Sequence, residues 1–287
     1  MTRRGSLWRL LLGALAIATA TAATAGQTCE ATPPDTNSTT RALGLAERTQ
    51  ASLDASGAQV VIIARAGQDL RKYGLQWSHL AFAYREEAPV QARPVSPVLG
   101  QISDLPVQAP RHGTWRIVHK LNQCGTAEAA VFRQGLAEFF LDTPFRYEAA
   151  YVIPDPEVQA ALLRVLTDDQ RLVQWHTPAY SVVAYPWSTK YQQSNQWALE
   201  TLASAMEPAI HSRAQAQAWL QLHEYRPTVL HLGPFTRLGG ELTKANVAFD
   251  DHPNGKRFSD HIETATVDSI FAWLPRADLG GKPVTID

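Results

Sequence analysis

The sequence predicts an α+β fold, with one domain following an N-terminal leader. Short apolar runs rich in valine and isoleucine indicate buried strands, and other stretches repeat apolar residues at helical spacing. The two kinds of element follow each other without regular βα alternation, which favours α+β over a parallel α/β fold. A chain of 287 residues allows one or two domains, and a single core is feasible at this size.

The first residues have the order of a secretory signal peptide. Three arginines (Arg3, Arg4 and Arg9) precede or flank an apolar run over 10–18, and small residues ending at Ala25 follow. We expect residues 1–25 to be removed near Ala25 and the remaining chain to be periplasmic or secreted. The apolar run is far shorter than the ~20 residues that span a bilayer, so no transmembrane segment is expected.

Residues 26–38 are polar and turn-rich, which indicates a tether, and the single α+β domain is expected over 39–287. Helical spacing of apolar residues predicts a first helix over 39–53, ended by Gly57. Apolar runs predict strands at 60–64, 77–84 and 115–121. The last two flank a proline-rich insert at 86–113. An insert of that length is typical either of a disordered segment or of a lid.

The second half of the chain continues the mixture of elements. The run 125–140 indicates a helix, and Asp155 followed by Pro156 indicates the start of another. A helix is predicted to open at Ser194, and Ser212 with Gln215 forms a capping box for the next. Strands are predicted at 149–153, 181–185, 228–232 and 246–249, and a last helix at 267–274.

Two histidines lie on predicted strands. Because side chains alternate along a strand, His79 shares a face with Ala81 and Ala83, while Leu80 and its alternate neighbours form the bulkier core face. If the strands at 77–84 and 115–121 pair, His119 lies beside His79. Each is either a core histidine bonded to a backbone carbonyl or part of a catalytic site, and spacing alone leaves both open.

The stretch RAGQDLRKYGLQWSHLAFAY (65–84) resembles the opening motif of circularly permuted, NlpC-type papain-like hydrolases. The turn contains Asp69, with one residue inserted, and the strand carries His79. In that family a second polar residue follows on the next strand, where His119 stands, and a cysteine nucleophile opens a later helix. The nearest match is YQQSNQW (191–197), which has Ser194 in place of the cysteine and one extra residue after the tyrosine. The resemblance implies a papain-like single domain with an antiparallel sheet and packed helices.

The resemblance assigns roles for acyl transfer. Ser194 would attack, His79 would take its proton, and His119 would orient the imidazole. Asn195 and Gln196 would bind a substrate carbonyl. Asp69, in the turn before the strand at 77–84, is the third expected binding residue. Locally, Ser194 is also an ordinary helix-capping serine, and the two amides are also ordinary first-turn residues.

Two cysteines occur, Cys29 and Cys124. In an oxidising compartment they are most simply a disulfide that ties the N-terminal segment to the domain. The alternative is that Cys124, which precedes the predicted helix at 125–140, is a rival nucleophile with Gln123 beside it.

Composition and charge restrict the partners. Loss of the three leader arginines takes the formal charge from −1 to −4, so neither nucleic acid nor an anionic membrane is an expected partner. Asp250, Asp251 and His252 are adjacent, which is not a metal-ligand spacing, and they read as a turn although His231 and His261 are near in sequence. We therefore expect no metal or cofactor. Three aromatic residues indicate either a ligand groove or packing: Trp175, Trp187 and Tyr191.

Most of the chain also resembles an uncharacterised family of secreted proteobacterial proteins, a domain of unknown function that shares SHLAF, VHKLNQCGTAE, YQQSNQW and VAFDDHPN. The first functional hypothesis is a hydrolase or acyltransferase acting on amide or ester bonds of a cell-envelope peptide or acylated small molecule. The second is a non-catalytic periplasmic binding or structural module without a working nucleophile. A third is a metal-dependent hydrolase. The sequence gives neither the substrate nor the oligomeric state.

Overall fold

The computed structural model describes residues 35–86, 113–142, 144–233 and 245–287. The expected signal peptide, Cys29 and nearly all of the insert at 86–113 lie outside these residues and stay predictions. Within the described part of the chain, no helix is both long and apolar enough to cross a membrane.

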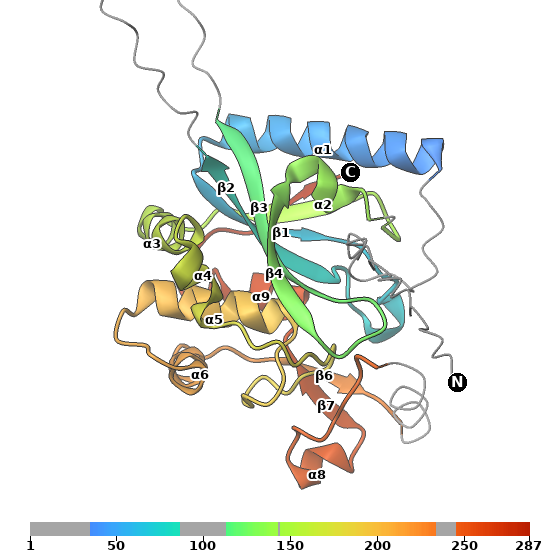
Figure 1. Ribbon diagram of the computed structural model, residues 1–287, viewed down its shortest axis with the longest axis vertical. Coiled ribbons are helices and arrows are strands. Elements are labelled where there is room, and N and C mark those ends of the chain that lie inside the picture. Colours follow the sequence, from blue (N-terminus) through green and yellow to red (C-terminus); the bar gives the residue numbers. More distant parts are fainter. Residues whose placement is uncertain (1–34, 87–112, 143, 234–244) are drawn as a thin grey trace, which may run out of the picture.

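A six-stranded antiparallel sheet forms the centre of the fold, in the order β4-β3-β2-β1-β5-β8 (Figure 1). Its strands are β1 (Val60–Arg65), β2 (His79–Glu86), β3 (Thr114–Asn122), β4 (Ala129–Gly135), β5 (Ala149–Val152) and β8 (Val284–Ile286). All six residues of β1 are buried, since this inner strand is covered on both faces. The mixed α+β class is confirmed, and so are the predicted strands at 60–64, 77–84, 115–121 and 149–153.

One face of the sheet is covered by α1 (Thr36–Ser56) and α2 (Leu136–Phe140). The helix α1 begins after Asp35, whose carboxylate accepts from the Ser38 amide at 2.7 Å, and it ends at Gly57, where φ is 69°. The helix therefore starts three residues before the predicted position, and the predicted tether at 26–38 is wrong for its last residues.

The opposite face is covered by a larger group of helices (Figure 1). These are α3 (Pro156–Leu166), α4 (Asp169–Gln174), α5 (Ser194–Met206), α6 (Arg213–Leu222) and α9 (Val267–Trp273). The helices start where Asp155, Ser194 and Ser212 predict, but the N-cap of α5 is Gln193, so the expected capping role of Ser194 is wrong. Ser212 accepts from the Gln215 amide, whereas the Gln215 side chain accepts from the His211 amide and does not close the predicted capping box. The helix α5 is buried along nearly its whole length, so it lies at the centre of this layer.

A second, two-stranded sheet lies apart from the first. It pairs β6 (Thr228–His231) with β7 (His261–Thr264), and the short α8 (Asn254–Arg257) precedes β7. Leu230 and Ile262 anchor it in a small apolar cluster with Phe249. A 3₁₀ turn, η1 (Arg71–Tyr73), connects β1 to β2.

Three predicted elements were wrong. The run 125–140 is not one helix, because its first part forms β4 and pairs with β3 from Asn122↔Ala129 to Arg116↔Gly135; only its last five residues are helical, as α2. The segments 181–185 and 246–249 form turns and irregular chain, not strands. In the first case the pairing with β3 decided the conformation over local propensity.

Candidate functional site

The structure brings His79 and His119 together. The Nε2 atom of His79 lies 2.8 Å from Nδ1 of His119, and the ring centroids are 5.0 Å apart. The two residues lie on adjacent strands, with Ala81 the residue nearest opposite His119 if the β2–β3 register is continued. The predicted juxtaposition of the two imidazoles is therefore confirmed as geometry. One hydrogen atom must lie between the two nitrogens, so one ring donates and the other accepts.

The imidazole pair is bordered by an arginine and an aromatic ring. Arg65 of β1 is the direct cross-strand partner of His79, and its guanidinium forms an ion pair with Asp142 at 2.5 Å. The guanidinium also donates to the carbonyl of Phe139 and lies 4.8 Å from the centre of that ring. Phe139 itself contacts both imidazoles, with centroid distances of 6.0 and 5.5 Å.

This environment keeps both imidazoles neutral. Burial, followed by the positive charge of Arg65, lowers the pKa of His119 to about 3. The same two causes, with His119 as a third, hold the pKa of His79 well below its ordinary value. His119 is fully buried, whereas His79 keeps some contact with solvent. A neutral imidazole with solvent contact can accept a proton, but this pair resists carrying a charge.

Ser194 is buried at the start of α5, where its hydroxyl is bonded to Tyr180. Trp197, one turn along α5 from Ser194, packs on Phe82 of β2 with ring centroids 5.9 Å apart. Phe82 and His79 are an odd number of positions apart on β2, so their side chains project from opposite faces of the sheet. His79 packs on Phe139, which belongs to the α1–α2 layer. The body of α5 and the histidine pair therefore lie on different faces of the sheet, which the sequence could not show.

The neighbours of Ser194 are part of the core. Its hydroxyl is bonded to the phenol of Tyr180. Burial raises the pKa of Tyr180, and the hydrogen bond from Ser194 offsets only part of this. The Asn195 side chain accepts from the amide of Leu80 at 3.1 Å and donates to the carbonyl of Ala265 at 3.1 Å. Both ends of this amide are thus used within the protein.

The other two predicted binding residues are also bonded internally. The Gln196 amide nitrogen lies 3.3–3.4 Å from three carbonyls of the 185–188 loop. Asp69 is exposed and forms a bidentate pair with Arg71, which lowers the pKa of Asp69 to about 2. The turn before β2 is instead held by the hydroxyl of Ser78, which accepts from the amides of Gly67 and Gln68.

A second polar group, which sequence reasoning missed, lies buried beneath α5. We call it the α5 polar cluster, and its members are Lys120, Gln192, Glu200, Arg213 and Gln217. Glu200 is fully buried and accepts two hydrogen bonds from the Arg213 guanidinium, at 2.7 and 3.1 Å. The amides of Gln192 and Gln217 donate to the same carboxylate. The buried charge is thus both paired and fully hydrogen-bonded, as burial of a charge requires.

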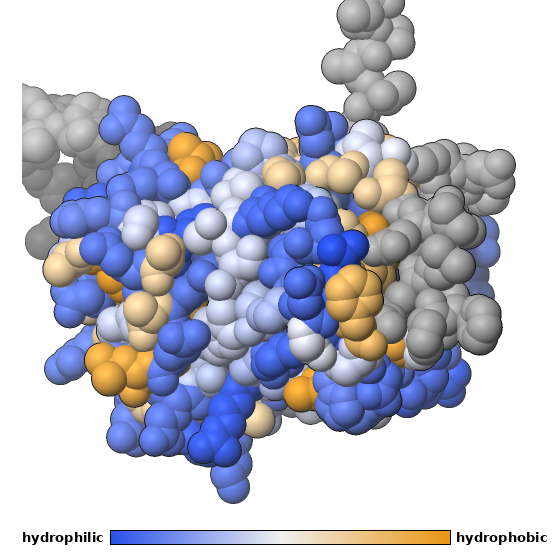
Figure 2. All heavy atoms as spheres, turned by 90° about the horizontal axis from the view of Figure 1, so that it is seen from below, coloured by the Kyte–Doolittle hydropathy of each residue, from blue (hydrophilic) through white to orange (hydrophobic). Residues whose placement is uncertain are grey.

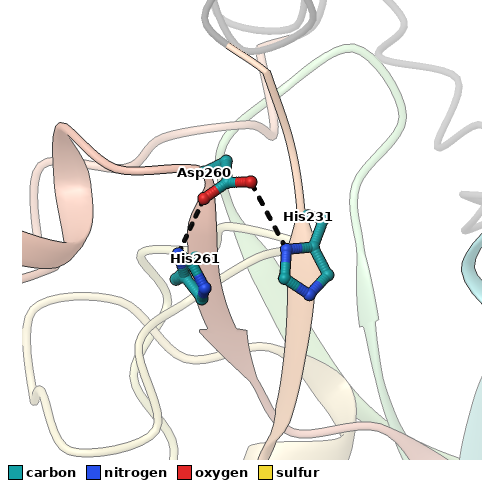
Figure 3. A group of neighbouring side chains, drawn as sticks. All are labelled: His231, Asp260 and His261. Atoms are coloured by element: carbon teal, nitrogen blue, oxygen red, sulfur yellow. Dashed lines mark hydrogen bonds and ion pairs between the residues drawn. The ribbon is translucent and has the colours of Figure 1, made fainter.

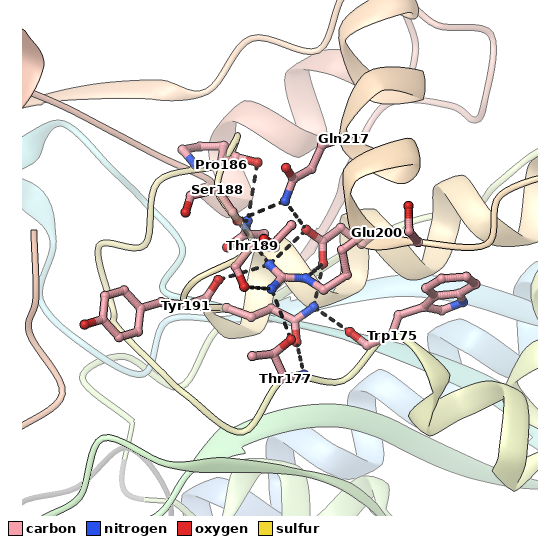
Figure 4. Close-up of polar contacts among 12 residues, drawn as sticks. Trp175, Thr177, Pro186, Ser188, Thr189, Tyr191, Glu200 and Gln217 are labelled. Carbon is pink, nitrogen blue, oxygen red and sulfur yellow. Dashed lines mark hydrogen bonds and ion pairs between the residues drawn. The ribbon is translucent and has the colours of Figure 1, made fainter. Parts of the chain in front are cut away.

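Arg213 also organises the loop that precedes α5, whose residues Ser188, Thr189 and Tyr191 are labelled in Figure 4. Its guanidinium donates to the carbonyls of Thr189, Tyr191 and Ser188 and to the hydroxyl of Thr177. One side chain therefore satisfies backbone carbonyls in a segment without regular secondary structure, which fixes the entry of the chain into α5.

Lys120 completes the cluster from the sheet. Its Nζ atom donates to the carbonyl of Thr177 at 2.6 Å and to Gln192 at 2.8 Å. Burial is the largest cause that lowers the pKa of Lys120 to about 6; Arg213 lowers it further and Glu200 raises it. Lys120 is adjacent to His119 on β3, so strand alternation alone places its side chain on the face opposite the histidines. That was the signal in the sequence that could have found the cluster.

Two cavities on the described surface contain neither the histidine pair nor Ser194. One, of about 260 Å³, lies between the ends of α6 and α9 beside Trp273 and Arg276. The other, of about 410 Å³, lies along α1 where it meets α2, beside Leu43 and Leu136. In Figure 2 the face seen from below is mostly hydrophilic, with hydrophobic side chains scattered over it.

The remaining predictions concern cysteines and a turn. Cys29 lies outside the described residues, so its disulfide with Cys124 stays a prediction. Asp251 and His252 are both fully buried and hydrogen-bonded to each other at 2.9 Å, and the Asp251 carboxylate also accepts from the Tyr185 amide at 2.8 Å. They hold the chain together at this turn. Of the aromatic residues proposed for a groove, Trp175 is buried in the core and Trp187 packs against it.

Taken together, the fold and the site define an α+β protein with a neutral histidine pair on one face of its sheet and a charged cluster buried on the other. The chain belongs to a bacterial family described as "Uncharacterized protein conserved in bacteria (DUF2145)", whose pattern matches residues 52–274. No curated protein matches the chain, and no solved structure matches it either. The resemblance to papain-like hydrolases therefore receives no support from these comparisons, and a papain-like fold is not confirmed.

Proposed function

We propose that this chain is a non-catalytic binding or structural module of the bacterial cell envelope. The observation that carries the proposal is that α5, which Ser194 opens, packs on one face of the central sheet while His79 projects from the other. Acyl transfer through a serine needs a base within hydrogen-bonding reach of the hydroxyl. The opposite sides of the sheet on which α5 and His79 lie argue against that reach.

The first turn of α5 supports the same conclusion. A helix that opens an active site presents its first amides to a substrate, where they stabilise an oxyanion. Here Ser194, Asn195 and Gln196 are all buried, and the side chains of the last two are bonded to the protein itself. The start of α5 therefore serves packing, and Ser194 acts as a small residue that fits against Tyr180.

The periplasmic or secreted location remains part of the proposal, because it depends on residues 1–25. A module of this kind would act by holding a ligand or a partner in the envelope, where an oxidising compartment also suits the proposed Cys29–Cys124 disulfide.

One observation favours the hydrolase as a second candidate. The 2.8 Å contact between His79 and His119 is what a catalytic base and its orienting group require. A hydrolase built on this pair needs a nucleophile on the α1–α2 face of the sheet. The helix that Ser194 opens packs on the other face.

Labelling with a serine-reactive fluorophosphonate separates the two functions. Wild-type protein, Ser194→Ala and His79→Gln are treated in parallel, and an active serine hydrolase serves as the positive control. We expect no labelling of the wild type beyond that of heat-denatured protein. Labelling that Ser194→Ala abolishes would overturn the proposal, and labelling that only His79→Gln abolishes would support the second candidate.

A further inference from the structure

Three exposed side chains with metal-binding atoms converge at one end of the small sheet. We call His231, Asp260 and His261 the β6–β7 cluster (Figure 3). One carboxylate oxygen of Asp260 lies 2.7 Å from Nδ1 of His261, and the other lies 3.4 Å from Nδ1 of His231. A ligand atom from each of the three residues lies within 4.8 Å of those from the other two.

The strand pairing fixes this convergence. His231 and His261 are direct cross-strand partners in the β6–β7 register. The preceding residue on β6, Leu230, and the following residue on β7, Ile262, are buried in the apolar cluster, so alternation turns both imidazoles to the solvent side. Asp260 precedes β7 directly and reaches both rings. The backbone therefore holds the three donors together without any contact from the main core.

We propose that the β6–β7 cluster binds one divalent transition-metal ion, with zinc as the best match. Two imidazoles and one carboxylate form the donor set of zinc sites that keep a fourth position open for water. Tetrahedral zinc at about 2.0–2.1 Å from each ligand places the ligand atoms roughly 3.4 Å apart. The present separations reach that arrangement through side-chain rotation alone, since all three side chains are exposed.

The chemistry of the donors also sets the selectivity. Imidazole nitrogen suits zinc, cobalt and nickel, whereas magnesium and calcium require mainly oxygen ligands. Magnesium therefore does not compete at this cluster. The open position faces solvent and accepts water or an anionic group of a ligand.

A nearby histidine shows why exposure matters. His252 also pairs with an aspartate, but its two ring nitrogens are occupied by Asp251 and by the carbonyl of Glu263, at 2.9 and 3.0 Å. Neither side chain of that pair has any exposed surface, so no ion can reach them. The β6–β7 cluster lacks this enclosure. The inference goes beyond the proposed function and stands whether or not the chain hydrolyses a substrate.

Calorimetric titration with zinc chloride tests the proposal. The mature chain, freed of any affinity tag and treated with a chelator, is compared with the double variant His231→Ala/His261→Ala and with Asp260→Asn. His211→Ala, which removes an exposed histidine elsewhere, is the matched control. We expect one zinc ion to bind each wild-type and control chain. In the double variant the affinity for zinc should fall by more than about 100-fold. That loss exceeds the ~10–100-fold that is typical when a residue hydrogen-bonded to a metal ligand is removed.

The visible spectrum of bound cobalt supplies a second readout that does not depend on the variants. Cobalt at the proposed site gives the intense absorption of a four-coordinate ion, and magnesium added in excess leaves it unchanged. Absence of zinc binding by the wild type, or equal affinity in the double variant with an unchanged circular dichroism spectrum, would overturn the assignment.

Discussion

The neutral histidine pair makes a quantitative prediction about acid stability. An unfolded histidine has an ordinary pKa near 6.5, while the pKa of folded His119 is about 3 and that of His79 is well below 6.5. The depressed pKa means that the stability contributed by each histidine is present above about pH 6.5 and is lost as the pH falls. The unfolded chain takes up protons that the folded chain refuses, so acid favours unfolding.

The magnitude follows from linkage. Between about pH 7 and about pH 5, a histidine that titrates only when unfolded, such as His119, costs roughly 2 kcal/mol of unfolding free energy, and His79 acts in the same direction. The contact between the rings adds a second restriction. With Nε2 of His79 and Nδ1 of His119 at 2.8 Å, two protonated rings would oppose two N–H groups, and the hydrogen bond would break.

Urea unfolding at the two pH values measures this effect. The variant His119→Asn keeps a polar group near the position of Nδ1 but does not titrate, so it should lose about 2 kcal/mol less than the wild type on acidification. His79→Gln, which keeps a polar group near Nε2, provides a second variant. His211→Gln, at an exposed position, controls for general charge effects.

The comparison uses the change with pH within each protein, so a uniform loss of stability in a variant does not affect it. If the wild type and both variants lost the same free energy between the two pH values, the histidines would not be held neutral. The account of the site given above would then be wrong.

Three further predictions concern the other face and the N-terminal segment. Arg213→Met leaves the fully buried Glu200 with amide donors only, so it should lower the free energy of unfolding in urea by about 3–5 kcal/mol. Glu200→Gln should lower it by less, because the guanidinium keeps its carbonyl acceptors. A larger loss for Glu200→Gln than for Arg213→Met would contradict this account. The pKa of folded Lys120 is about 6, so between about pH 6 and about pH 10 only the unfolded chain holds its proton. The free energy of unfolding should therefore rise with pH by up to ~1.4 kcal/mol per pH unit. Unfolding of Lys120→Met over the same pH range should lack this slope. Intact mass before and after alkylation without reductant should show no free thiol at Cys29 or Cys124, and two added alkyl groups would exclude the disulfide.

Local signals in the sequence predicted most helices well. Asp155 and Pro156 marked the start of α3, and Ser212 with Gln215 marked α6, because capping depends on residues within one turn. Burial of β1 was readable from its unbroken apolar run. These features depend on the chain within a few residues, and a single sequence contains all the information that they require.

Long-range features were less accessible. The residues of β4 include alanine, glutamine and arginine, which are compatible with a helix, and only the hairpin with β3 makes them a strand. The role proposed for Ser194 depends on long-range packing in the same way. Alternation showed which residues share a face of β2, but no local pattern shows which of the two faces α5 will cover.

The two polar groups together explain how β3 keeps its register. His119 and Lys120 are consecutive and fully buried, and they serve sites on opposite faces of the sheet. A shift of one residue would place the Lys120 amine against Arg65 and the His119 imidazole beneath α5. Glu200, Gln192 and His79 would then have the wrong neighbours. Apolar residues on both faces of an inner strand do not by themselves forbid such a shift, because either face accepts them. The buried polar partners do forbid it, and this gives them a structural role that is independent of catalysis.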